Sequence, residues 1–129
     1  MAAPASDDQA LQLLVVSDDP LVREQARFGF PKGVAVSFAT DSREAMDALQ
    51  GDEPSVVVVD MQTGSAGGYG LTRDMAADPR LARVPVVILL EREQDAWLAK
   101  KAGASSFHTK PLAPGELVRV VLAAAEHAG

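Results

Sequence analysis

Short apolar runs alternate with longer amphipathic segments along almost the whole chain. The runs are continuous, most clearly the four valines at 56–59, which is typical of strands buried on both faces of a parallel sheet. Strands are expected at 11–16, 34–38, 55–59, 84–90 and 104–109, and helices at 19–30, 40–51, 69–77, 93–102 and from 114 onward. Five strands alternating with five helices predict a doubly wound, five-stranded parallel α/β sheet in one domain.

Two helix starts carry recognisable capping residues. Asp19 directly before Pro20 is typical of an N-cap followed by proline at the first helical position. Thr40 or Asp41 can cap the second helix, with Glu44 as the partner that completes a capping box. Because Asp19 begins a helix, its side chain is expected to point away from any site at the strand ends.

Charged residues follow several of the predicted strands. Asp18 follows the first strand, Asp60 the third and Lys110 the fifth. With the strands in the order 2-1-3-4-5, the connections diverge between strands one and three and leave a crevice at the carboxyl edge of the sheet. Asp18 and Asp60 are expected to flank this crevice, and Lys110 to enter it from the far side. Taken alone, Asp60 fits a turn or helix cap equally well.

These residue types favour phosphoryl chemistry with a divalent cation. Carboxylates gathered in one crevice repel each other and raise their own pKa unless a cation neutralises them. Mg²⁺ is favoured because it binds one or two carboxylates together with water and a phosphate. Lys110 adds a positive charge suited to a phosphate oxygen, and the carboxylate of Asp60 can attack a phosphoryl group to form an acyl phosphate.

Composition narrows the classes of function. The chain has 129 residues, of which 47% are apolar and 23% charged, as in an ordinary globular domain. It has no cysteine, which excludes disulfides, thiol catalysis and Cys-ligated zinc and fits a cytoplasmic protein. A net charge of −6 without a basic stripe argues against direct nucleic-acid binding, and no apolar run is long enough for a membrane span. Residues 1–10 lack a signal-peptide pattern and are expected to form a flexible arm before a domain at 11–127.

Three segments resemble the response-regulator receiver domain of two-component signalling. They are LLVVSDDPLVRE at 13–24, VVVVDM at 56–61 and AGASSFHTKPL at 102–112, of which the last is the most specific. The resemblance covers roughly 11–125. It implies a flavodoxin-like fold and a signalling role without enzymatic activity.

The resemblance also implies a role for individual residues. Asp60 matches the phospho-acceptor, and Asp18 matches the acidic residue that ligates Mg²⁺ directly. Gln62 matches the position whose backbone carbonyl completes the metal site with Asp60. Lys110 matches the lysine that contacts the phosphoryl group, and Phe107 matches the aromatic switch position.

Three positions depart from the family pattern. Ser17 stands where the first acid of a pair is usual, which is expected to weaken Mg²⁺ binding; it either accepts a water near the metal or is a neutral filler. Leu90 occupies the second switch position, normally Ser or Thr, and is expected to extend the core of its strand. Glu91 follows where a small residue is usual, and its charge could oppose a phosphoryl group. These departures motivate an alternative, a pseudo-receiver that binds partners without switching.

A third functional class is a flavodoxin-like protein or a Mg²⁺-dependent hydrolase. The sequence has no recognisable FMN loop or leaving-group acid to support it.

The first hypothesis is a stand-alone receiver that takes its phosphoryl group from a sensor histidine kinase or a phosphotransfer protein. It would signal by contact with a downstream protein through the face of the 93–102 helix, the 104–109 strand and the last helix. The apolar stripe of that last helix leaves an edge open to a homodimer. Trp97 is expected to be partly in the core, and His108 to point opposite to Phe107, in a surface or packing role.

Overall fold

The computed structural model describes residues 11–51, 53–61 and 67–127. The strands are β1 (Leu11–Val16), β2 (Val34–Ala39), β3 (Val56–Asp60), β4 (Val86–Leu90) and β5 (Ser106–Thr109). The helices are α2 (Pro20–Gly29), α3 (Ser42–Gly51), α4 (Gly67–Ala77), α5 (Ala96–Ala102) and α6 (Glu116–His127), with a 3-10 turn, η1 (Glu93–Asp95), leading into α5. The expected arm at 1–10 and Gln62 lie outside the described residues.

The five strands form one parallel sheet in the order β2-β1-β3-β4-β5. This confirms the predicted fold and strand order. All residues of the inner strands β3 and β4 are buried, as their continuous apolar runs predicted. The edge strand β2 instead alternates between half-buried and exposed residues until Ala39, because only one side of an edge strand has a neighbour.

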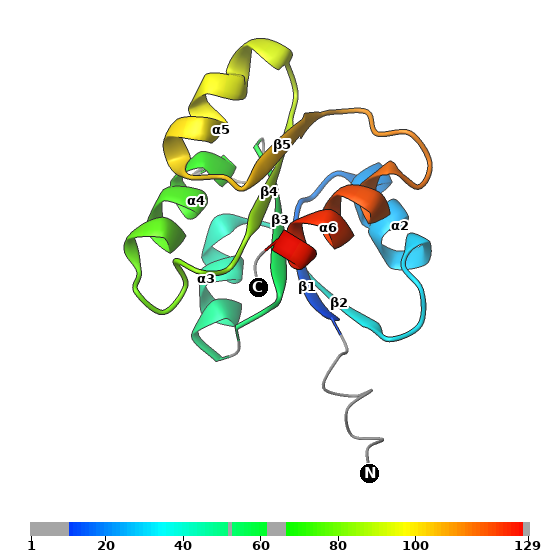
Figure 1. Ribbon diagram of the computed structural model, residues 1–129, viewed down its shortest axis with the longest axis horizontal. Helices are drawn as coiled ribbons and strands as arrows, with labels where there is room; N and C mark the ends of the chain where they lie inside the picture. Colours follow the sequence, from blue (N-terminus) through cyan, green and yellow to red (C-terminus); the bar gives the residue numbers. More distant parts are fainter. Residues whose placement is uncertain (1–10, 52, 62–66, 128–129) are drawn as a thin grey trace.

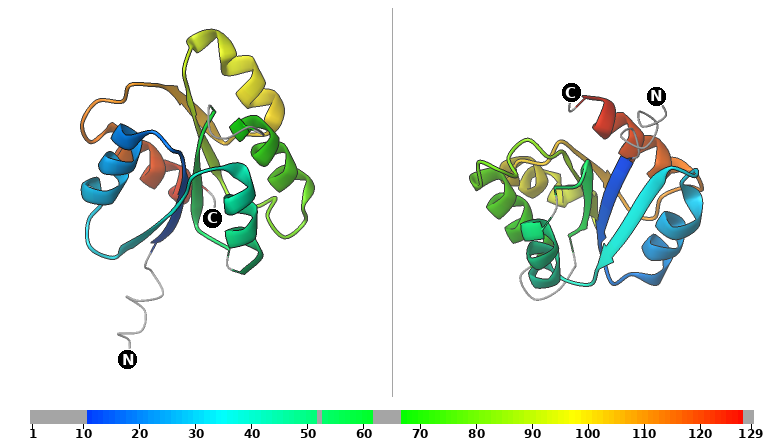
Figure 2. Two further views of the ribbon diagram at one scale, coloured as in Figure 1. Left: turned by 180° about the vertical axis from the view of Figure 1, so that it is seen from behind. Right: turned by 90° about the horizontal axis from the view of Figure 1, so that it is seen from below.

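Helices cover both faces of the sheet. Figure 1 shows α3, α4 and α5 together on one face and α2 and α6 on the other, and Figure 2 shows the same two layers from behind and from below. One core cluster joins the sheet to α3, α4 and α5 through side chains such as Leu49, Met75 and Ile88. A second cluster joins it to α2 and α6 through side chains such as Val22 and Val121.

Some element boundaries differ from the sequence prediction for local reasons. The last helix begins at Glu116 rather than at Pro114, because Gly115 has a φ of 83° that no right-handed helix accommodates. The capping box of α3 is confirmed: Asp41 accepts a 2.9 Å hydrogen bond from the Glu44 backbone N–H, and Glu44 accepts one from the Thr40 N–H. None of the helices in the described ranges combines the length and hydropathy that a membrane span requires.

Candidate functional site

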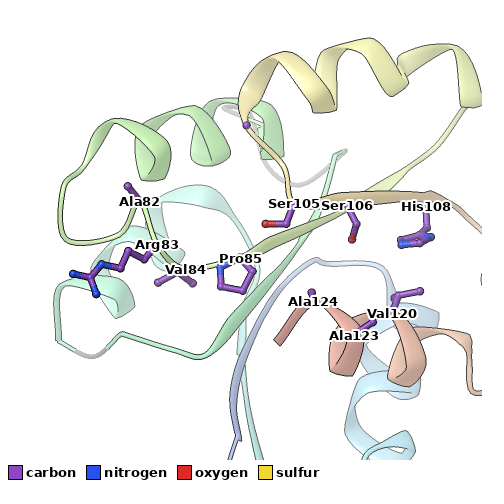
Figure 3. A pocket seen from close by; sticks show the side chains of 11 residues that line it. Ala82, Arg83, Val84, Pro85, Ser105, Ser106, His108, Val120, Ala123 and Ala124 are labelled. Atoms are coloured by element: carbon purple, nitrogen blue, oxygen red, sulfur yellow. The ribbon is translucent and has the colours of Figure 1, made fainter. Parts of the chain in front are cut away.

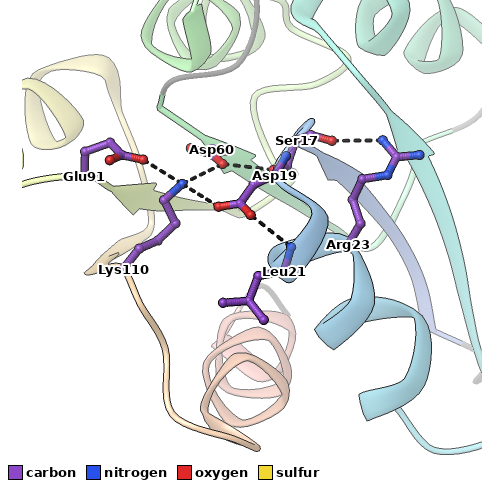
Figure 4. A network of polar contacts seen from close by, with 7 residues as sticks. All are labelled: Ser17, Asp19, Leu21, Arg23, Asp60, Glu91 and Lys110. Carbon is purple, nitrogen blue, oxygen red and sulfur yellow. Dashed lines mark hydrogen bonds and ion pairs between the residues drawn. The ribbon is translucent and has the colours of Figure 1, made fainter.

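Four strands deliver polar side chains to one edge of the sheet. Asp60 is the last residue of β3, Ser17 follows β1, Glu91 follows β4 and Lys110 follows β5. Because the strands are parallel and β1 and β3 are neighbours, their carboxyl ends meet, and Figure 4 shows the resulting network. Asp60 is only 1% exposed, so this acid sits at the bottom of the site.

Ser17 connects the end of β1 to Asp60. Its hydroxyl donates a 2.9 Å hydrogen bond to Oδ2 of Asp60 and accepts a 3.0 Å bond from the backbone N–H of Asp19. The Ser17 carbonyl in turn accepts a 2.9 Å bond from Arg23 of α2. Ser17 is fully buried. It therefore serves as a neutral hydrogen-bond donor to the carboxylate of Asp60.

Lys110 is the cation that the carboxylates of this network share. Its Nζ lies 2.9 Å from Oδ2 of Asp60, 3.1 Å from Oδ2 of Asp19 and 2.8 Å from a carboxylate oxygen of Glu91. Burial by itself would lower the pKa of Lys110, but its hydrogen bonds to Glu91, Asp60 and Asp19 raise that pKa well above its ordinary value. Lys110 is therefore a permanent cation held among carboxylates.

Asp19 belongs to the network, contrary to the expectation that its capping role directs it elsewhere. One carboxylate oxygen accepts a 2.9 Å bond from the Leu21 N–H and so caps α2, while the other accepts from Lys110. Partial burial by itself raises the pKa of Asp19, but the hydrogen bond from Lys110 and those from the backbone hold it below its usual value. A two-oxygen side chain can cap a helix and bind a cation at once, which the sequence prediction overlooked.

Asp18 is adjacent to the network but not within it. It is exposed, and within the described ranges its side chain has no hydrogen bond or ion pair. It lines an open pocket beside α2 with Arg23, Arg27 and Phe28. The structure thus brings Asp60 and Lys110 into contact and leaves Asp18 exposed beside their network.

The chemistry of this donor set fits a hard divalent cation. Three carboxylates around one ammonium leave a formal excess of two negative charges, and Asp18 adds a third beside them. Every side-chain donor is oxygen, the ligand that Mg²⁺ prefers. Among the described residues, no group of three His, Cys, Asp or Glu side chains is arranged to hold a metal by itself. A Mg²⁺ ion at this site would bind one or two of the carboxylates and complete its shell with water.

Of the two predicted switch positions, Leu90 lies in the core and Phe107 is half-buried against it. Leu90 is 1% exposed and belongs to the core cluster under α3, α4 and α5, which confirms that it extends the core of its strand. Phe107 packs against the same cluster, and Nζ of Lys100 lies 5.7 Å from its ring centroid. His108 faces the opposite side, toward α6, as the alternation of β5 predicted.

A second hollow lies away from this network. It measures about 520 Å³ and is lined by the segment before β4, by β5 and by α6, with Arg83, Ser106 and His108 among its polar residues (Figure 3). None of the residues around Lys110 lines it. The chemistry of the carboxyl edge is therefore separate from this pocket.

The sequence prediction missed the part that Asp19 and Glu91 play. Glu91 was singled out for its charge, but its ion pair with Lys110 was not foreseen. The signal was available in the strand pairing, because Leu90 and Thr109 are partners across β4 and β5 and the next residues are therefore neighbours. The Lys110 N–H also donates a 2.8 Å bond to the Leu90 carbonyl, which extends that pairing by one residue.

The fold and the site together define a class of protein, a doubly wound parallel α/β domain with an acid–lysine cluster at its carboxyl edge. The sequence matches the profile of the response regulator receiver domain over residues 13–122. The chain belongs to this family and is a receiver domain of two-component signalling.

Relatives extend over most of the chain. An uncharacterized 14.6 kDa protein of Leptolyngbya boryana is 32% identical over 114 residues, covering 86% of this chain and 87% of that protein. The response regulator Rre1 of Synechocystis sp. is 32% identical over 117 residues, covering 88% of this chain but 51% of that protein. The crystal structure of a LuxR-family two-component response regulator from Aurantimonas sp. matches with a TM-score of 0.79 and 28% identity, over 92% of this chain and 87% of that one. The chain thus spans about half of Rre1 and most of the other two.

Proposed function

We propose that this receiver accepts a phosphoryl group on Asp60 and passes the signal on by protein–protein contact. The observation that carries the proposal is the contact of buried Asp60 with partly buried Lys110, whose Oδ2 and Nζ atoms are 2.9 Å apart at the carboxyl end of β3. A carboxylate in this place is presented to the crevice by the sheet, and its ammonium partner is suited to a phosphoryl oxygen.

The chemical step is an in-line displacement at phosphorus. An oxygen of the Asp60 carboxylate forms a bond to phosphorus while the bond to the donor breaks, and the donor nitrogen or oxygen leaves with the electron pair. A sensor histidine kinase or a phosphotransfer protein is the proposed donor, as in the family to which the chain belongs. Lys110 would neutralise charge on the transferred group, and Ser17 would hold the attacking carboxylate in place.

Asp18 and Asp60 are the side chains proposed to hold Mg²⁺. The backbone carbonyl of Gln62 is proposed as a further ligand, although Gln62 lies outside the described residues. When bound, the ion would neutralise the phosphoryl oxygens during transfer. Ser17 supplies a hydroxyl where a second acid is usual, so the proposed affinity for the ion is low.

The output surface proposed for this receiver is formed by α5, β5 and α6. Trp97 on α5 is 60% exposed, so the expectation that it is partly core was wrong. Leu122 of α6 is also exposed. Large apolar side chains that face solvent are suited to a protein partner, whether a downstream protein or a second copy of the chain. A stand-alone arrangement and a cytoplasmic location stay predictions.

Phosphorylation can be tested with a small phosphodonor. The protein is incubated with acetyl phosphate and Mg²⁺, and its mass is measured; addition of one phosphoryl group is expected in the wild type. The matched control is Asp60→Asn, which keeps the shape but lacks the nucleophile. A second control omits Mg²⁺ by adding a chelator. Absence of modification in the wild type, or equal modification of Asp60→Asn, would sink the proposal.

The competing candidate is a pseudo-receiver, an interaction module that does not switch. It is favoured by one observation, the burial of Leu90 in the core at the position where the family uses a hydroxyl. A phosphoryl group biases a conformational equilibrium only through contacts that differ between the two states, and a leucine offers no such hydrogen bond. A wild type that is modified on Asp60 but shows no amide shifts in β5 and α6 would favour this candidate.

A further inference from the structure

Lys110 has no donor to spare in the structure. An ammonium group carries three N–H donors, and Nζ of Lys110 lies within 3.1 Å of three carboxylates, those of Asp19, Asp60 and Glu91. A phosphoryl group on Asp60 that binds Lys110 must therefore take over one of these positions. Whether Lys110 can contact the phosphoryl group therefore depends on which carboxylate gives up its bond to the ammonium.

Glu91 is the partner that can leave. Asp60 is buried and itself carries the phosphoryl group, so it stays beside Lys110, and Asp19 is fixed by its second bond, to the Leu21 N–H. Glu91 follows the last residue of β4 in the turn before η1, and its side chain is 42% exposed. The described structure shows it bound to Lys110 alone. Its side chain can rotate into solvent without breaking any other described contact.

We propose that Glu91 is a built-in competitor for the phosphoryl group, holding the Lys110 ammonium while Asp60 is unmodified and giving it up when Asp60 is phosphorylated. The inference rests on the proposed function of Asp60. Glu91 is a positioning residue, because it acts through Lys110. The strand pairing holds Glu91 next to Lys110. The Lys110 N–H donates a 2.8 Å bond to the Leu90 carbonyl, so the side chains of Glu91 and Lys110 start from adjacent backbone positions.

The effect expected from this competition is moderate. An ion pair between partly exposed side chains changes an equilibrium by about 1.5- to 5-fold. Repulsion between the Glu91 carboxylate and the doubly charged phosphoryl group acts in the same direction. Removal of the Glu91 charge should therefore raise the affinity for a phosphoryl mimic about 2- to 5-fold at low salt, and the gain should shrink at high salt.

The experiment is a titration of beryllofluoride at fixed Mg²⁺, followed by the amide NMR signals of Asp60 and Met61. It compares the wild type with Glu91→Gln, which keeps the side-chain shape and removes the charge. Glu93→Gln is the matched control, since Glu93 is exposed nearby and has no described contact with Lys110. Glu91→Gln is expected to bind more tightly than the wild type, and Glu93→Gln to match the wild type.

Each outcome decides one proposal. Tighter binding by Glu91→Gln alone, reduced by salt, supports the competitor role. Equal binding by the wild type and Glu91→Gln, or an equal gain in Glu93→Gln, overturns this inference and leaves phosphorylation of Asp60 standing. Failure of every variant, the wild type included, to bind beryllofluoride overturns both. The denaturation midpoints of all variants are measured alongside; loss of the partly exposed Glu91–Lys110 ion pair should change the folding equilibrium by no more than about 5-fold, and Glu93→Gln should leave it unchanged.

Discussion

The hydroxyl of Ser17 donates its hydrogen bond to the same Asp60 oxygen, Oδ2, that Lys110 binds. Ser17 also accepts from the Asp19 N–H, so it joins the end of β1, the acid of β3 and the cap of α2. A second acid at this position would instead repel Asp60 unless a cation separated them. The serine thus adds no negative charge that a metal ion would have to neutralise. Replacing it with an acid tests how strongly the site depends on Mg²⁺.

Ser17→Asp should increase the affinity for Mg²⁺ and decrease stability in its absence. The added carboxylate supplies a metal ligand but faces Asp60 across the distance now bridged by a 2.9 Å hydrogen bond. Calorimetric titration with Mg²⁺ and thermal unfolding with and without the ion measure the two effects. Ser17→Asn, which has nearly the same shape but no charge, is the control. Equal Mg²⁺ affinity in the Asp and Asn variants would contradict the prediction.

Leu90→Thr should restore a hydroxyl at the switch position at a cost in stability. Because Leu90 is 1% exposed in the core, the free energy of unfolding should fall by about 2–5 kcal/mol, as for other large-to-small core substitutions. The response of Phe107 and β5 amides to beryllofluoride should increase. A hydrogen bond to a charged oxygen contributes about 1.5–3 kcal/mol, enough to shift a conformational equilibrium more than tenfold.

The control for this substitution is Leu89→Thr, which places the same residue on the opposite face of β4, where Leu89 is fully buried. It should lose comparable stability without gaining a response at Phe107. An equal response in both variants would show that loosening of the core, rather than the new hydroxyl, produces it.

Asp19 contributes a helix cap and an ion pair, and two substitutions separate them. Asp19→Ala should lower the free energy of unfolding by about 0.5–2 kcal/mol, because α2 loses its cap. Asp19→Ser keeps a capping oxygen, and loss of the partly exposed ion pair should lower that free energy by at most about 1 kcal/mol. Urea unfolding at low and high salt measures both, and only the ion-pair effect should fade with salt.

Asp41 provides the matched pair of substitutions for Asp19. It accepts from the Glu44 N–H at the start of α3, and the described structure gives it no contact with Lys110. Asp41→Ala and Asp41→Ser should differ by the cap alone and show little salt dependence. If Asp19→Ser and Asp41→Ser prove equally sensitive to salt, the Asp19–Lys110 pair adds nothing to stability.

The sheet could be predicted from the sequence because its inner strands leave little ambiguity. Residues 56–59 and Val86–Leu90 are apolar without interruption, and only burial on both faces accounts for such runs. The strand order also predicted that Lys110 enters the crevice beside Asp60 from the far side. The contacts of Glu91 and Asp19 did not follow from it, because long or two-oxygen side chains reach partners that backbone position alone does not specify.

In helix α5, the sequence did not predict correctly which residues face solvent. It has seven residues, and its buried side chains are Ala99 and Ala102. Trp97 lies two residues before Ala99 and therefore on the other side of the helix, where it is exposed. A helix this short has too few apolar positions to define its buried face from sequence, and the large side chain alone suggested the wrong one.

Gly68 at the start of α4 lies against the backbone that presents Asp60. A Cβ at this position would stand 2.8 Å from the Asp60 carbonyl oxygen and would collide with a methyl group of Val59. Gly68→Ala should therefore push α4 away from the end of β3 and lower the free energy of unfolding by about 1–3 kcal/mol. The amide signal of Asp60 should shift, and beryllofluoride should bind more weakly.

Gly70, two residues further along α4, is the matched control. Among the described residues, no atom beyond the backbone of its own helix lies within 4 Å of a Cβ placed there, so Gly70→Ala meets no described neighbour. Alanine stabilises a helix relative to glycine by about 1 kcal/mol, and the free energy of unfolding should rise by up to that amount. Urea unfolding of the two variants is then expected to move in opposite directions from the wild type. A Gly68→Ala protein as stable as Gly70→Ala, with an unshifted Asp60 signal, would show that close packing of α4 does not position the acceptor.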